Sequence, residues 1–489
     1  MSKVKPQHYN SKTYYIGTIA SIIAMFLAPA LLKPWAPEIT QEGVSVVCIF
    51  IGCIIGFLTN HDLILSSMLA MGSLVIYGIY TPSGVISAFM GMSIIWQVIT
   101  LFALCYVIVR DGTGETIARY LLTRKITQKA PAVMVLILLL AIGLASAFMG
   151  VWGALIVFLP LLEGIYEEAH MDSKSDLARL LSLGAYIVMC VSPGALGRMQ
   201  GGNLALNQYF LDAVGKDVMG LDFVVTAFAL VVVFVIVFTL ALKFIFKCDL
   251  SVFSKVDLRS TIGEDNSKLS RRQAYPLIAF LVIAIYSFTS TYWPDAGFIG
   301  GLKSLGTVLF TTIVLAVLTL VRVDGEQIFE PGTAFKEGVN WPIVMAIASM
   351  ATIGGQLVSD DFGVKAWLSR VLGGIMGSSN GIVLLILATI LTTCLTNFFS
   401  NTATGYVMAA LCAAISEPIV AAGFNITAVA VAITMSSQVA YLTYASSGQA
   451  AILLSRDNMD DKFIWTKGLV VLVLWIVVTI AVCSICALV

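Results

Sequence analysis

The sequence predicts an all-α polytopic membrane protein with about eleven transmembrane helices and two re-entrant hairpins, and three observations predict this fold. The 489-residue chain is 59% hydrophobic and only 11% charged, with a mean hydropathy of +0.95. It contains many apolar runs of about twenty residues, the length that crosses the hydrocarbon of a bilayer. Two further apolar stretches are too long for one span and are interrupted near the middle by small polar residues. Lipid must be the solvent for most of this chain, because its few charges cannot keep so much apolar surface in water.

The apolar runs place the spans in order along the chain. They are expected at 14–32, 43–58, 63–80, 92–110, 175–211, 221–246, 273–290, 303–322, 339–358, 425–455 and 463–487. The two interrupted stretches, 131–162 and 380–416, have polar loops at both ends and are expected to enter and leave from one side of the membrane. The first run ends at Lys33-Pro34 without a small-x-small cleavage site. We therefore expect a retained first span rather than a signal peptide.

Loop charge predicts the orientation. Three loops carry clusters of basic residues: Lys3, Lys5 and Lys12; Arg110, Arg119, Arg124, Lys125 and Lys129; and Lys243, Lys247, Lys255, Arg259, Lys268, Arg271 and Arg272. These three clusters fall on one face of the membrane only if the stretch 131–162 enters and leaves from the cytoplasm and the stretch 380–416 enters and leaves from the outside. By the positive-inside rule this face is cytoplasmic. The protein is then expected in the cell (inner or plasma) membrane, with its N-terminus in the cytoplasm and its C-terminus outside.

The chain also contains an internal repeat. Ser-Ala-Phe-Met-Gly-Val-Trp-Gly at 146–153 and Thr-Asn-Phe-Phe-Ser-Asn-Thr-Ala at 396–403 stand at the turns of the two hairpins. Each hairpin is followed by a long span with a break, at 192–203 and at 443–449. Inverted repeats with glycine-broken helices are typical of transporters. The alternative is that the glycines only allow close helix packing, but four breaks at paired positions favour a transport site.

The repeat predicts how the chain is divided. The expected units are an N-terminal tail with the first helix at 1–36, a first inverted repeat at 43–247, a cytoplasmic loop with a linking helix at 248–302, and a second inverted repeat at 303–489. The first repeat holds a hairpin at 131–166 and a broken helix at 175–211, and the second holds a hairpin at 380–416 and a broken helix at 425–455.

Ser400, Asn401 and Thr402 lie where the apolar run of the second hairpin resumes as a helix. All three residue types cap helix N-termini well. A helix N-terminus supplies free N–H groups and about half a positive charge, which favours a carboxylate. The same side-chain oxygens can also hold a sodium ion. Plain capping is the alternative, and capping and binding are compatible.

The run Thr396-Asn-Phe-Phe-Ser-Asn-Thr-Ala-Thr-Gly405 resembles the second Ser-Asn-Thr signature of the divalent anion:sodium symporter family, which contains dicarboxylate and citrate carriers. The order of spans, hairpins and broken helices resembles this family over nearly the whole chain. The resemblance implies a homodimer that works by an elevator mechanism. The hairpins and broken helices would form the moving domain, and the other spans the scaffold.

Three positions depart from the family pattern. Gly150, Val151 and Trp152 stand where the first Ser-Asn-Thr is expected, and neither Val nor Trp can coordinate sodium through its side chain. The first break resembles the Gly-Thr-Pro-Pro-Asn region, with Gly202 and Asn203 at its end, but Arg198 precedes them. The second break has Ser446, Ser447, Gly448 and Gln449 in place of Thr-Pro-Pro-Asn. These departures affect both sodium sites of the family pattern.

Arg198 is the charged side chain that the sequence places deep within a span. No acidic residue is expected at that depth to pair with it, so its partner is expected to be a substrate carboxylate, which a guanidinium binds in a bidentate manner. The alternative is that Arg198 binds the carbonyls of its own unwound loop. A fixed cation in place of sodium predicts obligatory anion exchange, because an empty moving domain would carry an uncompensated charge through the barrier.

The remaining site predictions are weaker. Gln200, Asn203 and Gln449 can donate to carboxylates or satisfy the broken backbone, and Trp152 can lie beside the site or simply pack. The complete predicted substrate-binding set is Ser400, Asn401, Thr402, Arg198, Asn203, Gly150, Val151, Trp152, Gly202, Ser446, Ser447 and Gln449. No catalytic residue, metal ligand or cofactor is expected, although sodium remains possible.

Other classes of function fit less well. His8, His61 and His170 all lie in expected loops and no His-Glu-x-x-His motif exists, which argues against an enzyme. The balanced charge gives no indication of nucleic-acid binding. A channel suits paired hairpins less well than alternating access. The sequence predicts Na⁺-independent exchange of C4–C6 di- or tricarboxylates such as succinate, malate, 2-oxoglutarate or citrate. The alternatives are a Na⁺-coupled dicarboxylate symporter and a carrier of inorganic anions such as sulfate or arsenite.

Overall fold

The computed structural model describes residues 12–59, 62–113, 116, 131–255, 269–367, 370, 380–399, 401–443, 446–454, 456 and 458–488. The described chain is almost entirely helical, which confirms the coarse prediction of an all-α polytopic membrane protein. Seven of its helices are long and apolar enough to cross a membrane, or up to nine if each of two bent pairs is one span. Four shorter apolar helices of 10–17 residues belong to other predicted spans and to the second hairpin.

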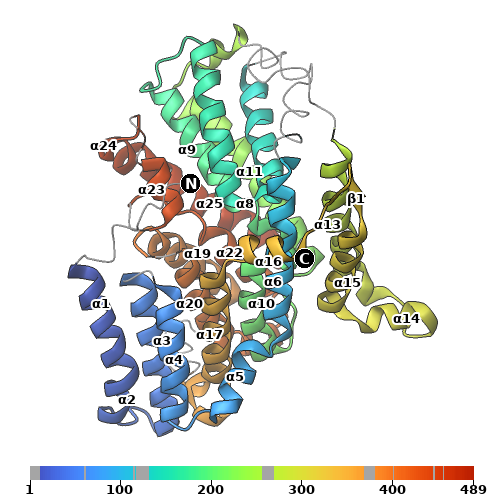
Figure 1. The fold of residues 1–489 in the computed structure, drawn as a ribbon. Helices are drawn as coiled ribbons and strands as arrows, with labels where there is room; N and C mark the ends of the chain where they lie inside the picture. The colour runs from blue at the N-terminus through green and yellow to red at the C-terminus, as the bar shows by residue number, and fades with distance from the viewer. Residues whose placement is uncertain are drawn as a thin grey trace.

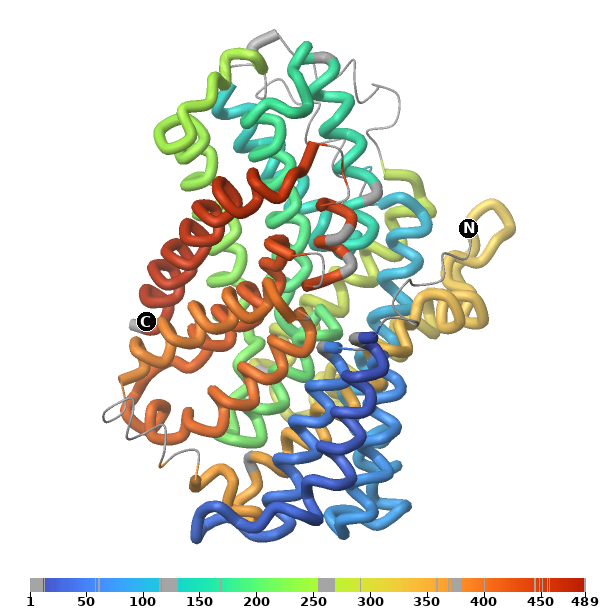
Figure 2. Tube along the Cα trace, turned by 90° about the vertical axis from the view of Figure 1, so that its left-hand side faces the viewer, coloured from blue at the N-terminus to red at the C-terminus, as the bar shows by residue number. Residues whose placement is uncertain are grey.

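The N-terminal helices form a bundle at one end of the molecule (Figures 1 and 2). Its elements are α1 (Lys12–Ile22), the π-helical turn η2 (Ile23–Leu27), α2 (Ala28–Leu31), α3 (Gln41–Thr59), α4 (Leu63–Ile76) and α5 (Pro82–Met90). Asp62 caps α4 by accepting from the Leu65 N–H. Small residues bring the helices close, since Ser21 donates to the Gly52 carbonyl at 2.7 Å and Ser73 to the Met25 carbonyl at 2.6 Å. Such bonds satisfy hydroxyls that lipid cannot.

The helices that follow reach the opposite end of the molecule through α8, α9 and α11 (Figures 1 and 2). They are α6 (Ser93–Arg110), α8 (Pro131–Glu168), α9 (Asp176–Val191), the 3₁₀ turn η4 (Gly194–Met199), α10 (Gly201–Val214) and α11 (Leu221–Phe244). The span predicted at 175–211 is thus broken between α9 and α10, at the position that its glycines indicate. Gly197 has φ +56°, a conformation that side chains rarely adopt.

Helix α8 consists of two limbs that meet at Gly150, whose φ of 70° and ψ of 167° are not helical. The contacts with α9 show that the chain reverses there. Tyr166 of α8 bonds to Ala178 and Ser182, so the two helices run antiparallel there. Ser192 lies ten residues after Ser182, so if α8 were straight it would face a residue about ten positions before Tyr166. Gly143 faces Ser192 instead: a methyl group on Gly143 would stand 3.0 Å from the Ser192 hydroxyl. The two limbs therefore run back along each other, whereas their return to one side of the membrane stays a prediction.

The middle of the chain contains α13 (Arg271–Thr289), α14 (Gly297–Ser304), α15 (Gly306–Leu320), the strands β1 (Arg322–Val323) and β2 (Glu326–Gln327), α16 (Pro331–Gly338) and α17 (Trp341–Val358). The sequence analysis missed the short elements, namely α5, α14, α16 and the two-residue strands. Bends of 97° between α14 and α15 and of 69° between α16 and α17 shape this region. Helices α13 and α15 pack together and against α6, beside the rest of the molecule in Figure 1.

The C-terminal part of the chain contains α19 (Gly381–Thr396), α20 (Asn401–Ala414), α21 (Glu417–Ala421), α22 (Thr427–Ser436), α23 (Gly448–Leu454), α24 (Asp461–Phe463), the π-helical turn η8 (Ile464–Gly468) and α25 (Leu469–Leu488). Helices α19 and α20 pack together as the two limbs of the second hairpin. The following break differs from its prediction. Helix α22 ends at Ser436, well before the expected break at Thr443. A turn closed by the bond from the Val439 N–H to the Ser436 carbonyl follows, and beyond it the backbone bonds to Asn397 of the hairpin.

Candidate functional site

The hairpins and the broken helices of the two repeats meet inside the molecule. Tyr186 on α9 donates its hydroxyl to the Ala440 carbonyl in the second break at 2.7 Å. Gly194 in the first break faces α22, since a methyl group there would stand 3.5 Å from the Met435 sulfur. Gly405 on α20 lies between Ser437 and Leu206, with a methyl group 3.2 Å from the Ser437 hydroxyl and 3.8 Å from Leu206 Cδ2. We call this meeting point the hairpin–break junction.

Helices α10 and α20 pack against each other with their N-termini on the same side of the junction. Gly405 is in the first turns of α20, and Leu206 is in the first turns of α10. Beyond their other ends, Lys216, which follows α10, donates to Asn425, which follows α21, at 2.9 Å, and α10 also contacts α21. The two helices are therefore close to parallel, and their positive ends lie side by side.

The tip of the first hairpin carries Gly150, Val151 and Trp152. A methyl group on Gly150 would meet no atom within 4 Å, so its positive φ rather than crowding calls for glycine. Trp152 is 48% exposed, whereas Val151 packs against the main core. Phe148 meets Phe280 of α13 edge to face. These side chains supply no oxygen for a cation, as the sequence indicates.

The first break is held by amide side chains. Asn203 is 5% exposed and donates from Nδ2 to the carbonyls of Gly194 at 2.7 Å and Gly197 at 3.0 Å. Gln200 caps α10 by accepting from the Gly202 N–H at 2.8 Å. Asn203 therefore satisfies the unwound backbone, which is the alternative that the sequence analysis left open for it. Its Oδ1 has no bond within the protein among the described residues and is the part of the amide available to a ligand.

Arg198 has an acidic partner, so the expectation that it lacks one is wrong. Its Nη2 lies 2.7 Å from Asp217 Oδ2 in the α10–α11 connection. The guanidinium also donates to the carbonyls of Met219 and Ser287 and lies 5.6 Å above the Phe288 ring. The sequence analysis missed Asp217 because it looked for acids within spans, whereas this one folds back from the connection. Substrate binding by Arg198 stays a prediction, and the substrate would have to displace Asp217.

The tip of the second hairpin lies at the junction. Ser400 is outside the described residues. Asn401 is buried at the first position of α20, and Thr402, the next residue, is half-buried. The Thr396 hydroxyl lies 3.1 Å from Asn401 Oδ1 and 2.5 Å from the Ser437 carbonyl. The Thr396 hydroxyl thus lies between one oxygen of the hairpin and one of the break.

Asn397 is a further residue at this tip that the sequence analysis did not select. Its side chain is fully buried, and its Oδ1 accepts from the N–H groups of both Tyr441 and Leu442 at 2.9 Å. Its Nδ2 donates to the carbonyls of Thr393 and Val439. The signal available in the sequence was a polar amide just before two phenylalanines at the hairpin turn.

The other predicted residues of the second break serve the backbone around α23. The Ser446 hydroxyl donates to the Thr443 carbonyl at 2.7 Å, and the Ser447 hydroxyl accepts from the Ala450 N–H at 3.0 Å. Gln449 is half-buried on α23. None of them bonds to the predicted residues of the first break in the described chain.

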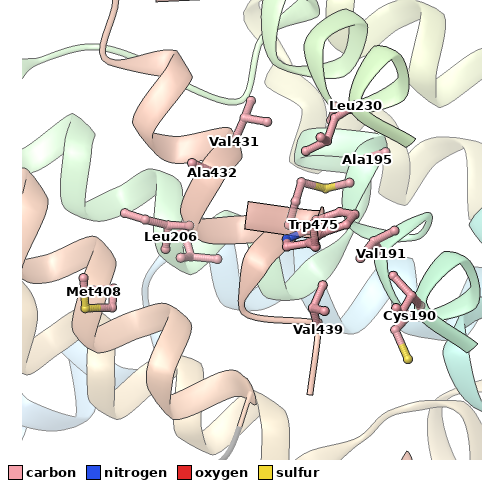
Figure 3. Packing of buried hydrophobic residues seen from close by; sticks show 14 of the residues in the cluster. Cys190, Val191, Ala195, Leu206, Leu230, Met408, Val431, Ala432, Val439 and Trp475 are labelled. Carbon is pink, nitrogen blue, oxygen red and sulfur yellow. The ribbon is translucent and has the colours of Figure 1, made fainter. Parts of the chain in front are cut away.

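Apolar packing supports the junction from one side. Trp475 of α25 is fully buried, and its indole N–H donates to the Ser436 hydroxyl at the end of α22. Figure 3 shows this ring among apolar side chains of both repeats, with Val191 and Val439 near it. Two hydroxyls near the first break, those of Ser192 and Thr434, are buried without a hydrogen-bond partner in the described chain. The described residues contain no group of three or more His, Cys, Asp or Glu side chains that could hold a metal ion.

Known proteins agree with this architecture. None of the curated protein sequences matches the chain. Among solved structures, the chain is similar to MtrF of Neisseria gonorrhoeae, whose structure illuminates a class of antimetabolite efflux pumps. The identity is 13% and the TM-score 0.55, over 98% of this chain and 95% of that one, so the likeness concerns the fold. Residues 46–437 match the model of the citrate transporter family, CitMHS. The protein is therefore a membrane transporter that belongs to the citrate transporter family.

Proposed function

We propose that the protein exchanges C4–C6 di- or tricarboxylates across the membrane and binds them at the hairpin–break junction. The observation that carries this proposal is the parallel pair α10 and α20, which begin side by side at a break and at a hairpin tip. Two adjacent helix N-termini offer positive potential to an anion with more than one carboxylate. Membership of the citrate transporter family supports the same class of substrate.

Neutral residues complete the proposed site. Asn401 and Thr402 lie at the start of α20 and are its proposed side-chain donors. Asn203 and Gly202 lie at the start of α10, where the Asn203 Nδ2 and the Gly202 N–H are bonded within the first break, so they shape the site rather than donate to the anion. The rest of the predicted set, Gly150, Val151, Trp152, Ser446, Ser447 and Gln449, surrounds the tip of the first hairpin and the second break. Arg198 is proposed to bind one carboxylate in exchange for Asp217.

Exchange without sodium is the proposed mode of transport. Because Arg198 pairs with Asp217, an empty carrier would not hold an uncompensated cation, and the charge of Arg198 no longer argues for obligatory exchange. The mode now rests on the first hairpin tip, where Val151 and Trp152 replace residues that could bind sodium. One observation favours Na⁺-coupled symport as the second candidate. The Thr396 hydroxyl lies within hydrogen-bonding distance of both Asn401 Oδ1 and the Ser437 carbonyl, which places three oxygens where a cation could be bound.

An elevator movement of the two hairpins and broken helices against the other spans is the proposed mechanism, in a homodimer in the cell membrane. The inverted repeats at 43–247 and 303–489, a cytoplasmic N-terminus and an external C-terminus belong to this proposal. It is supported by the close contacts that join hairpins and breaks of both repeats into one unit.

The test is uptake of labelled succinate and citrate by the purified protein in liposomes, with and without internal dicarboxylate and with and without a sodium gradient. Uptake that requires internal dicarboxylate and ignores sodium supports exchange. Uptake into empty liposomes that follows the sodium gradient refutes exchange and favours symport. If labelled sulfate exchanges with internal sulfate but neither labelled succinate nor labelled citrate is taken up, the carboxylate assignment is wrong.

A further inference from the structure

We infer that Asn397 is the positioning residue of the transport site. Its amide locks the second break onto the second hairpin and so sets the affinity for the carried anion. The inference deepens the proposed function and rests on it for the identity of the anion. The geometric part of the inference is that the Asn397 amide holds the second break on the second hairpin, which we call the lock. It rests on the contacts of Asn397 alone.

The amide of Asn397 uses both ends at once. Oδ1 accepts from the N–H groups of Tyr441 and Leu442, each at 2.9 Å. Nδ2 donates to the Val439 carbonyl at 2.9 Å and to the Thr393 carbonyl of its own limb at 2.8 Å. One side chain therefore satisfies three backbone groups of the break. It takes the place of the helical bonds that α22 loses after Ser436.

Two hydroxyls strengthen the same connection. Thr443 donates to the backbone carbonyl of Asn397 at 2.6 Å, and Thr396 donates to the Ser437 carbonyl at 2.5 Å. The backbone from Ser437 to Thr443 is thus held at both ends and in the middle by the turn of the second hairpin. Within a membrane, no water is at hand to replace these bonds, so their loss leaves buried polar groups unpaired.

The two repeats differ in this respect. At the turn of the first hairpin, Ala147 occupies the place that Asn397 has in the aligned run of the second. The first break is held from within by Asn203, which bonds to Gly194 and Gly197 of that break. The amide connection between a hairpin tip and its break therefore belongs to the second repeat. That tip also carries Asn401 and the N-terminus of α20.

This connection should act on affinity rather than on turnover. Hairpin and break belong to the same moving unit in the proposed elevator, so their contact persists through the transport cycle. The lock fixes the position of the groups at the start of α20 relative to those of the break. A ligand that must order these groups itself binds more weakly.

The kinetic test compares Asn397→Ala with Asn425→Ala in reconstituted protein. Asn425 serves as the control, because its amide also bonds to the backbone, at the Thr427 N–H and the Cys486 carbonyl, but at the other end of α22, where it also accepts from Lys216. We expect KM for the carried carboxylate to rise about tenfold or more in Asn397→Ala, with maximal flux changed less than about twofold. Asn425→Ala should lose thermal stability without this rise in KM. A similar KM in both variants and the wild type overturns the inference.

Two further variants cover the case in which Asn397→Ala does not fold. Thr443→Val removes one bond to the hairpin and keeps the amide, so a smaller rise in KM is expected. Asn397→Asp keeps acceptors for Tyr441 and Leu442 but turns oxygens toward the Val439 and Thr393 carbonyls. Its KM should rise at least as much as that of Asn397→Ala. Wild-type KM in both Thr443→Val and Asn397→Asp contradicts the lock.

The geometric part has a readout that needs no substrate. Val439 is fully buried, so a cysteine there, in a protein freed of its nine native cysteines, should react slowly with a membrane-permeant maleimide. Addition of Asn397→Ala should speed this labelling about tenfold, whereas addition of Asn425→Ala should not. Equal labelling rates overturn the lock even if no flux is seen. Absence of succinate and citrate flux in the wild type, with the expected labelling, refutes the proposed substrate but supports the lock.

Discussion

The pair of Arg198 and Asp217 offers a direct test of whether the guanidinium binds the carried anion. Asp217→Asn removes the internal competitor and leaves the hydrogen-bonding shape nearly unchanged, whereas Arg198→Ala removes the guanidinium. If a substrate carboxylate takes the place of Asp217, the first substitution lowers KM and the second raises it. Opposite shifts are the expected result, because both carboxylates compete for the same donors.

The size of the effect follows from burial. The Arg198 side chain is 20% exposed and that of Asp217 is 40% exposed, with the pair at 2.7 Å. This is between a solvated pair, worth less than about 1 kcal/mol, and a buried one, whose disruption costs about 3–5 kcal/mol. An intermediate value of about 1–2 kcal/mol corresponds to a shift in KM of about tenfold in each direction.

The assay is counterflow of labelled succinate in liposomes, with KM and maximal flux measured separately, and thermal melting of each purified variant as the control for folding. The double variant should have a KM close to that of Arg198→Ala, because Asp217 has no competitor role once the guanidinium is gone. Parallel loss of flux and stability in both single variants, with KM unchanged, would refute the reasoning. The pair would then only join the first break to the α10–α11 connection.

Three more predictions follow from single contacts. A methyl group on Gly354 would overlap the ring of Tyr209, so Gly354→Ala should destabilise the packing of α17 on α10 by about 1–3 kcal/mol, measured by thermal melting. Thr396→Val keeps the volume but removes the hydroxyl that joins hairpin and break. Exchange predicts flux that is independent of sodium before and after this change, whereas sodium dependence lost in the variant would support symport. The Phe463 N–H and then Arg179 hold the pKa of Asp460 below its ordinary 3.8, so its stabilisation is present above that pH and is lost as the pH falls through the lowered pKa. Asp460→Asn should therefore melt earlier than the wild type by the same margin from about pH 5 to 8, and the difference should shrink in stronger acid; a margin that varies within that range contradicts the assignment.

Much of the fold could be predicted because the lipid solvent leaves a strong signal in the sequence. Apolar runs of span length, and their interruption by glycine and small polar residues, indicated the long helices and the break at Gly197. The bends that create α14 and α16 were not predictable, because an apolar run has the same composition whether it is straight or bent. The end of α22 was predicted too late for a related reason. Nothing local stops this helix at Ser436, and the bonds that replace its own come from Asn397.

Some features of the candidate site could likewise be predicted from the sequence, and others could not. The Ser400-Asn401-Thr402 run and the breaks predicted by themselves that helix ends meet inside the membrane, because the unpaired backbone groups of a helix end must be satisfied there by polar side chains or a ligand. The partners of Arg198 and Asn397 were decided only by the tertiary structure. Asp217 is nineteen positions from Arg198, and Tyr441 is forty-four from Asn397, so no local pattern links them. Composition and periodicity determine which segments enter the membrane and where they break, whereas the choice of partner for each buried polar group depends on how distant segments pack.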